Sequence, residues 1–467
     1  MIKPNEIFVA NDINPSSVLD FINNCADTKT DIHTLEIYKN DELKIKLALP
    51  PYSCENKAQL YSLSKSFSST AIGLLVTDGV LSVEDKLVDV FPERVPNDID
   101  ENMKNLCVKH ILSMNSGHAE CPMGKIKNCD DIVNAFMSEK QSFEPGTHFM
   151  YNNSATYMLS EIVTKFTGMT MLDFLSIRLF APLGIKDMRW DTFKSGRNQG
   201  AVGLHASADD LSKLGRLYLN KGMWHGKRIL SEEWVEMATC VHSDNSGNGT
   251  ADWTAGYGFQ FWMNAREGYR GDGAFGQLCV VLPKRETVAV IQCYSNDMQS
   301  EMDNLFALID NLYTDGGISE VELCDKINSM NAPEKTEKFD KNIMGNIYRL
   351  NENEYKFTLL YFENNNDDLV INFSNGERWQ QINCGFEKYL ESNIYIQAFK
   401  PTIGNLVRTD REEHVRLAAY YTYDGNELLI HIRYLNNPHR DWFKFTFTDS
   451  GLVWSSQDRA DLIGEIC

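Results

Sequence analysis

The sequence contains no long hydrophobic run, since none of its segments approaches the roughly 18 apolar residues that a membrane-spanning helix requires. Basic residues are also scarce: 45 Lys and Arg face 65 Asp and Glu, which gives a formal net charge of -20. A nucleic-acid-binding surface needs clustered Lys and Arg. The sequence therefore predicts a partner that is neither a membrane nor a nucleic acid.

Two further features bear on the compartment. The amino-terminal segment MIKPNEIFVANDINPSS lacks a positively charged stretch followed by an uninterrupted apolar core, so no secretory signal is expected. The eleven cysteines are scattered without tight pairs, and an odd number cannot all pair within one chain. Reduced thiols fit this distribution better than a disulfide framework, and we expect a cytoplasmic protein.

The pattern of apolar and polar residues changes along the chain. Its 467 residues also exceed what one hydrophobic core usually supports. Residues 30–315 mix strand-like and helix-like segments, which predicts an α/β (α+β) core with helices on a sheet. From Gly345 onward, alternating apolar and polar runs are separated by the turn dipeptides Asn375-Gly376, Asp424-Gly425 and Ser450-Gly451. We therefore expect two domains, residues 1–335 and a small antiparallel β domain over residues 336–467.

A hydroxyl and an amine lie three positions apart in LYSLSKSFSSTAIGLL, at Ser62 and Lys65. The apolar spacing predicts a helix here, on which positions i and i+3 share a face. A lysine of lowered pKa could remove the serine proton, and the Ser62 N–H in the first helical turn is free to hold an oxyanion. The pair alone is common by chance, and taken by itself it is better explained as an ordinary polar helix start.

A second polar group, Tyr151-Asn152-Asn153, follows a Gly/Pro-containing loop and precedes a helical pattern. Tyr151 could relay the serine proton, and Asn153 could donate to a substrate carbonyl. The alternative is a buried tyrosine followed by an Asn/Ser helix cap.

Several blocks give the chain a family resemblance. They are SLSKSFSSTAIGLLVTDGVLSVEDKL, LCVKHILSMNSGH, EPGTHFMYNNSATYMLSEIVTKFTGMTMLDFLSIRLFAPLGI and GLHASADDLSKLGRLYLNKG. In order and spacing they resemble the serine β-lactamase-related superfamily, which includes class C β-lactamases, D-aminopeptidases and carboxylesterases of the penicillin-binding fold. The resemblance covers about residues 30–315 and implies that fold, an antiparallel sheet flanked by helices. It also implies Ser62 as acyl-forming nucleophile, Lys65 as its base partner, Tyr151 as general acid/base and Asn153 as a substrate-binding residue.

A third element departs from the family pattern of Lys or His, a small residue and Gly. The matching stretch YRGDGAFGQLCVVLP aligns Asp272-Gly273-Ala274 with that triplet and Phe275 with the second oxyanion-hole N–H. A backbone donor survives a change of side chain, but an acid replaces the cation that would attract a substrate carboxylate. Asp272 would suit an ammonium-bearing substrate, or a neutral ester or amide. Alternatively, Asp272 pairs with nearby Arg270 and never meets substrate.

Other patterns have simpler interpretations. Cys107, His110, His118 and Cys121 have a zinc-like spacing, but the resemblance places this segment in packing near the site, and we expect neither a metal nor a cofactor. Ser207 and Asp210 read as a helix capping box. Three aromatic residues could line a substrate cleft, but aromatic residues in strands more often fill the core: Trp253, Tyr257 and Trp262.

The sequence thus predicts a serine hydrolase that acts on an ester or amide bond, including a peptide bond, through a Ser62 acyl-enzyme. Two alternatives remain open: a penicillin-binding-like sensor that acylates with little turnover, and a catalytically silent binding scaffold with an altered third element. The expected partner is a small-molecule or peptide substrate. The C-terminal domain could cover the cleft or pair chains into a homo-oligomer.

Overall fold

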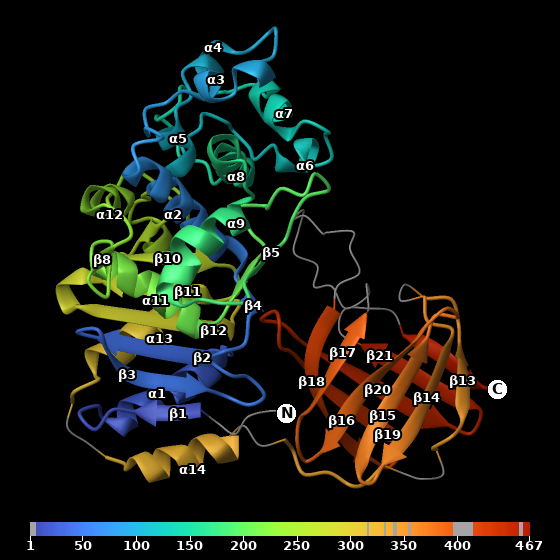
Figure 1. Ribbon diagram of the computed structural model, residues 1–467. Helices are drawn as coiled ribbons and strands as arrows, with labels where there is room; N and C mark the ends of the chain where they lie inside the picture. Colours follow the sequence, from blue (N-terminus) through green and yellow to red (C-terminus); the bar gives the residue numbers. More distant parts are fainter. Residues whose placement is uncertain are drawn as a thin grey trace.

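The computed structural model describes residues 6–314, 317–330, 333–339, 343–353, 356–395, 414–456 and 461–467. Figure 1 shows a mixed body of sheet and helices beside a β barrel. The predicted fold class, an antiparallel sheet flanked by helices with a C-terminal antiparallel β domain, is confirmed. The expected boundary at residue 335 stays a prediction, and it falls in residues 333–339, which have no regular secondary structure.

The main sheet of the mixed body has the strand order β1-β3-β2-β12-β11-β10-β9, and its neighbouring strands are antiparallel. Its strands are β1 (Glu6–Val9), β2 (Asp31–Lys39), β3 (Glu42–Ala48), β9 (Trp262–Met263), β10 (Tyr269–Gly273), β11 (Gln277–Leu282) and β12 (Thr287–Tyr294). Asn40 and Asp41 take the left-handed conformation that a tight turn between β2 and β3 requires. Shorter strands pair elsewhere: β4 (Ala58–Gln59), β5 (Arg189–Trp190), β6 (Leu204–Ala206), β7 (Met223–Trp224) and β8 (Lys227–Arg228).

Helices cover both faces of this sheet, so its central strands are apolar on both sides. On β12, Ala289 and Ile291 face a core formed with α1 (Pro15–Asp27), α13 (Met298–Asp310) and α14 (Glu320–Met330). Val288 and Val290 face the opposite core, formed with α2 (Ser64–Thr77) and α11 (Ala208–Leu219). The alternation along one strand therefore fixes which helices lie on which face.

A helical region extends beyond this second core, above the sheet in Figure 1. It contains α3 (Leu87–Val90), α4 (Glu101–Lys104), α5 (Val108–Leu112), α6 (Met123–Ile126), α7 (Ile132–Ser138), α8 (Asn153–Thr167), α9 (Met171–Leu175) and α10 (Ala181–Leu183), while α12 (Glu232–Ala238) packs on α2. Among the described residues, no helix is both long and apolar enough to cross a membrane.

The second body is an antiparallel barrel of order β16-β15-β14-β13-β22-β21-β20-β19-β18-β17. Its strands are β13 (Ile347–Leu350), β14 (Leu359–Asn365), β15 (Asp368–Ser374), β16 (Trp379–Phe386), β17 (Leu390–Tyr395), β18 (His414–Asp424), β19 (Glu427–Tyr434), β20 (Arg440–Thr448), β21 (Gly451–Ser456) and β22 (Leu462–Ile466). A parallel pairing between β16 and β18 closes the barrel. Asn375-Gly376 lies between β15 and β16, Asp424-Gly425 lies at the end of β18, and Ser450-Gly451 lies at the start of β21.

Candidate active site

Ser62 lies in a 3₁₀ turn, Tyr61–Leu63, that leads directly into α2. The Leu60 N–H donates to Leu204 O at 2.9 Å. The Ser64 hydroxyl donates to Tyr61 O at 2.6 Å and accepts from the Leu204 N–H at 3.1 Å. Strand β6 therefore fixes the turn on both sides of the serine.

Two glycines on β10 allow this turn to approach the sheet. A Cβ on Gly273 would lie 2.0 Å from Leu60 O, and one on Gly271 would lie 2.9 Å from Ser66 Oγ. Position 273 requires glycine, because Leu60 O is a backbone atom, whereas a Cβ at position 271 would displace the Ser66 hydroxyl. The close contact brings the third sequence element to the side of Ser62.

Lys65 meets Ser62 as the sequence predicts. Its Nζ donates to Ser62 Oγ at 3.0 Å and to Ala201 O at 2.9 Å. The side chain is buried, with 1% of its surface exposed. Burial lowers the Lys65 pKa to about 7, because the charged ammonium is poorly solvated there, while the charges of Cys121 and Asp272 act in the opposite direction.

Tyr151 lies on the other side of the same atoms. Its hydroxyl interacts with Ser62, and its ring centroid lies 4.7 Å from Lys65 Nζ. Burial raises the pKa of Tyr151 well above that of an ordinary phenol, and the interaction with Ser62 opposes this rise. The ring stacks on Trp262 at 5.5 Å. Ser62, Lys65 and Tyr151 thus form one connected group.

The two asparagines after Tyr151 have different roles. Asn152 is buried and caps α8, because its Oδ1 accepts from the N–H groups of Ser154 and Ala155 at 3.0 and 3.2 Å. Asn153 is half-buried and begins the helix. Its Oδ1 is buried and has no hydrogen-bond partner among the described residues. The helix-cap interpretation therefore holds for Asn152 and leaves Asn153 available to a ligand.

Asp272 is bound by the protein itself. The Arg270 Nε donates to Asp272 Oδ2 at 2.9 Å, and Arg270 Nη1 donates to Asn264 Oδ1 at 2.9 Å. Burial raises the Asp272 pKa, and the Arg270 guanidinium opposes this rise. The pairing predicted as one of two alternatives exists, and contact between Asp272 and a substrate stays a prediction.

Phe275 lies in the turn between β10 and β11, with a left-handed φ of 65°. Its carbonyl accepts from the Ser295 N–H at 3.1 Å, which fixes the turn to the end of β12. Within the described part of the chain, neither the Phe275 N–H nor the Ser62 N–H donates to a protein group. The N–H groups of Ser62 and Phe275 are therefore two backbone donors without a protein acceptor in the described residues.

The sequence of this chain matches a known family: the beta-lactamase family profile covers residues 35–312. The chain belongs to the beta-lactamase family. Penicillin-binding protein 4* of Bacillus subtilis is 32% identical over 149 residues, covering 30% of this chain and 32% of that protein. The 6-aminohexanoate-dimer hydrolase of Paenarthrobacter ureafaciens is 24% identical over 261 residues, covering 51% of this chain and 66% of that protein.

The chain spans about a third of the first relative and just under two thirds of the second. A solved structure, SurE with D-Leu, is similar over 97% of this chain and 99% of its own, at a TM-score of 0.52 and 15% identity. This likeness concerns the fold, and it extends over both bodies of the beta-lactamase-family chain.

The aromatic residues near Arg270 are neither plain strand core nor an open cleft. Tyr257 and Trp262 form a small buried cluster with Met114, against which Tyr151 and Trp253 pack. The Arg270 guanidinium lies 4.5 Å from the Trp253 ring centroid. In this family member the cluster therefore supports Tyr151 and the Arg270–Asp272 pair.

The remaining sequence candidates have structural contacts. The Cys107 N–H donates to His110 Nδ1 at 3.1 Å, and His118 Nδ1 lies 3.0 Å from Ser116 Oγ. Among the described residues, no group of three or more His, Cys, Asp or Glu side chains is arranged to hold a metal ion. The capping box predicted at Ser207 and Asp210 is confirmed at the start of α11.

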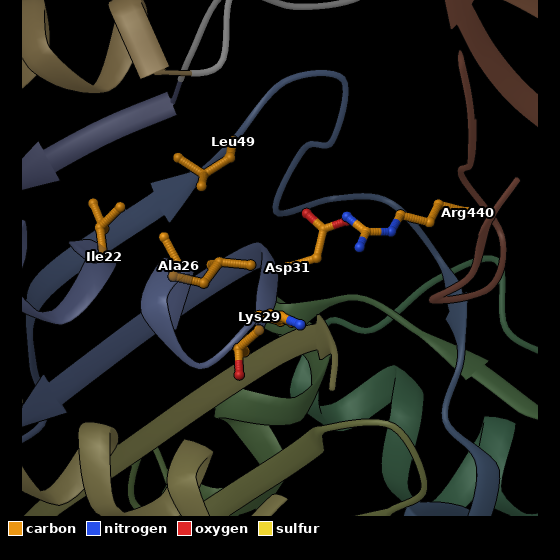
Figure 2. Close-up of a pocket in the computed structure, with 8 residues that line it drawn as sticks. Ile22, Ala26, Lys29, Asp31, Leu49 and Arg440 are labelled. Atoms are coloured by element: carbon orange, nitrogen blue, oxygen red, sulfur yellow. The ribbon is translucent and has the colours of Figure 1, made fainter. Parts of the chain in front are cut away.

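A pocket of about 310 Å³ lies apart from these residues, where Arg440 of the barrel meets α1 and β2 (Figure 2). Arg440 points toward Asp31, and their charged groups are 3.3 Å apart. Arg433 pairs with the same carboxylate. The lining contains none of the predicted site residues. Because residues of both bodies line the pocket, it lies at a contact between them.

Sequence reasoning missed two contributors to the site. The Ala201 carbonyl binds Lys65 through the backbone, which no residue type signals. His439, from the barrel, lies 2.7 Å from the Tyr61 hydroxyl through its Nε2. Its segment NNPHRD carries no motif, and only the folded arrangement brings it to Tyr61, the residue before Ser62.

Proposed function

We propose that this protein is a serine hydrolase that cleaves an ester or amide bond through an acyl-enzyme on Ser62. The observation that carries the proposal is the 3.0 Å contact between Lys65 Nζ and Ser62 Oγ, together with a Lys65 pKa lowered to about 7. Near pH 7 about half of such an amine is neutral and can accept a proton. Membership of the beta-lactamase family supports the same chemistry.

In the acylation step, the Ser62 hydroxyl gives its proton to the pair formed by Lys65 and Tyr151. The Ser62 Oγ then bonds to the substrate carbonyl carbon. The N–H groups of Ser62 and Phe275 receive the negative charge that develops on the carbonyl oxygen. The bond to the leaving group breaks, and Tyr151 returns the proton to the departing oxygen or nitrogen.

In the deacylation step, water attacks the acyl carbon and loses a proton to the same pair. The bond between Ser62 Oγ and the acyl carbon breaks, the carboxylic acid leaves, and Ser62 regains its proton. Lys65 and Tyr151 thus return to their starting protonation states. Apart from the substrate and one water molecule, no other reactant is needed to balance the two steps.

The polar groups near Ser62 narrow the class of substrate that the site would accept. Asp272 and Arg270 form a pair of no net charge, so the site offers no free cation at the third element. This favours a neutral ester or amide, including a peptide bond, over a substrate recognised through a carboxylate. Asn153, with its unpartnered Oδ1, is the proposed contact for a substrate N–H.

The proposal is tested by intact-mass analysis after treatment with a fluorophosphonate probe. We expect one adduct on the native chain, none on Ser62→Ala, and normal labelling of Ser69→Ala, a buried serine farther along α2. Absence of an adduct on the native chain, or equal labelling of Ser62→Ala, would contradict the proposal. Turnover of nitrocefin, p-nitrophenyl acetate and D-amino-acid amides then separates a hydrolase from an acylating sensor.

We further propose the cytoplasm as its compartment. All eleven cysteines are free thiols, and Cys129, Cys240 and Cys467 are exposed. Exposed thiols persist in a reducing environment. Assembly into a homo-oligomer through the barrel stays a prediction.

A further inference from the structure

The loop between β19 and β20 reaches from the barrel to the nucleophile. Asn436 O accepts from the N–H of Gln59 at 3.0 Å, and Gln59 lies three residues before Ser62. His439 Nε2 and the Tyr61 hydroxyl are 2.7 Å apart, directly before Ser62 in sequence. His439 is 7% exposed and Tyr61 3%, so both groups are shielded from solvent.

His439 also contacts the other side of the site. Its ring centroid lies 4.7 Å from that of Phe275, 5.3 Å from that of Tyr294 and 6.0 Å from that of Tyr61. Phe275 stacks on Tyr294 at 5.7 Å and meets Tyr61 edge-on at 5.4 Å. The imidazole is therefore the one member of this four-ring cluster contributed by the barrel.

The backbone conformations of Tyr61 and Phe275 explain why such support matters. Both have a left-handed φ, 48° at Tyr61 and 65° at Phe275. Residues other than glycine adopt this conformation at a cost, and it persists where the surroundings hold it. The Ser62 N–H belongs to the peptide unit that follows Tyr61, and the second donor is the N–H of Phe275 itself. The backbone conformations of Tyr61 and Phe275 therefore orient the two available donors.

The barrel holds the imidazole in place through the loop itself. The His439 N–H donates to Asn437 Oδ1 at 2.9 Å, and His439 O accepts from the Tyr434 N–H at 3.2 Å. Burial lowers the pKa of His439 to about 4, so the ring is neutral near pH 7. A neutral imidazole can share one hydrogen with the Tyr61 phenol and still pack among aromatic rings.

We infer that His439 is a positioning residue for the oxyanion hole, through which the C-terminal barrel holds Tyr61 and Phe275 in the conformations that aim the Ser62 and Phe275 N–H groups. The inference rests on the proposed acyl-enzyme mechanism. It gives the barrel a part in the chemical step, because the hole is fully formed only while this loop is docked.

The test measures the rate of fluorophosphonate labelling against probe concentration, which separates the bond-forming rate constant from probe affinity. For His439→Ala we expect the rate constant to fall about 10- to 100-fold, since losing a whole oxyanion donor costs about 10²- to 10³-fold. Probe affinity should stay within about twofold of the native value, because the groups that bind the probe are retained. Tyr61→Phe and His439→Phe, which keep the rings and remove the hydrogen bond, should give equal smaller losses that do not add in the double variant.

Arg440→Gln is the matched control, because Arg440 joins the barrel to Asp31 without touching the four-ring cluster. We expect its labelling rate to match the native one. If Arg440→Gln loses as much as His439→Ala, the effect belongs to docking of the whole loop, and the specific role of His439 is overturned. Thermal unfolding of each variant identifies a loss caused by misfolding, and Tyr61→Phe, which leaves the barrel sequence intact, then decides the matter.

The two proposals fail in different ways. A native chain that takes no label overturns the proposed function and this inference with it. A native chain that labels at Ser62, with His439→Ala and Tyr61→Phe labelling at the native rate, overturns the inference alone.

Discussion

Arg270 and Asp272 form a buried pair near the proposed nucleophile Ser62: Arg270 Nε lies 2.9 Å from Asp272 Oδ2, with side chains 0% and 8% exposed. The two residues are two positions apart on β10 and lie on the same face of the strand. The acid that replaces the family's cation is therefore neutralised by its neighbour.

The first prediction concerns this pair and the stability of the fold. Asp272→Leu and Arg270→Met should each lower the free energy of unfolding by about 3–5 kcal/mol, because each leaves one buried charge without its partner. The double variant should lose less than the sum of the two, since it buries no charge. Urea unfolding followed by circular dichroism measures all three.

Lys125→Met serves as the control for this cycle, because Lys125 pairs with Glu120 at the surface, where both side chains are more than half exposed. We expect no measurable change in its unfolding midpoint. Strictly additive losses at positions 270 and 272 would show that the pair is not coupled.

How much of this could be read from the sequence depends on distance along the chain. The turn at Asn40-Asp41, the helix after Ser62 and the barrel turns follow from local patterns, and the structure has them. The Asn- and Asp-rich run at residues 364–368 has the composition of a loop, yet it ends β14 and begins β15 around a tight turn. The backbone pairing of β14 with β15, which composition does not reveal, sets where the strands end.

Contacts between distant residues were beyond such patterns. Ser62 and Lys65 are three positions apart, so helical geometry alone predicts their contact. Tyr61 and His439 are 378 positions apart, and no periodicity connects them. Their contact follows from the way two separately patterned bodies pack, which one sequence does not encode in any local signal.

The second prediction concerns the pH dependence of acylation. With a Lys65 pKa of about 7, the neutral amine falls roughly tenfold per pH unit below that value, and the labelling rate should fall with it. Above pH 8 the rate should level off. Lys65→Arg should label at least about 100-fold more slowly, because a guanidinium stays charged throughout. A profile that still rises near pH 10 would contradict the role of Lys65.

The same pKa has a consequence for stability, with a definite sign. Between pH 7 and 10.5 an unfolded chain keeps the Lys65 proton that the folded chain has lost. The unfolded state binds more protons, so the free energy of unfolding rises with pH across this window. Lys65→Met should remove this rise, which urea unfolding at pH 7, 8 and 9 measures.

The third prediction separates the hydroxyl of Tyr151 from its ring. Tyr151→Phe keeps the stacking on Trp262 and the contact with Lys65, so the thermal midpoint should change little. The loss of the hydroxyl should slow acylation by about 10²- to 10⁴-fold, the usual contribution of a general acid/base. Tyr157→Phe is the control, since that hydroxyl bonds Glu161 on α8 and should not affect labelling. Native labelling by Tyr151→Phe would remove Tyr151 from the mechanism.

The fourth prediction tests the close approach of β10 to the nucleophile turn. Gly273→Ala would bring a methyl group to 2.0 Å from Leu60 O, a backbone atom that cannot turn away. The strand and the turn must separate, which should cost about 1–3 kcal/mol of unfolding free energy and also slow labelling of Ser62. Gly247→Ala is the matched control, because its methyl group would meet no atom within 4 Å. Stability and labelling rate measured together decide the point, since a loss of stability without slower labelling would mean that β10 supports the fold but does not set the position of Ser62.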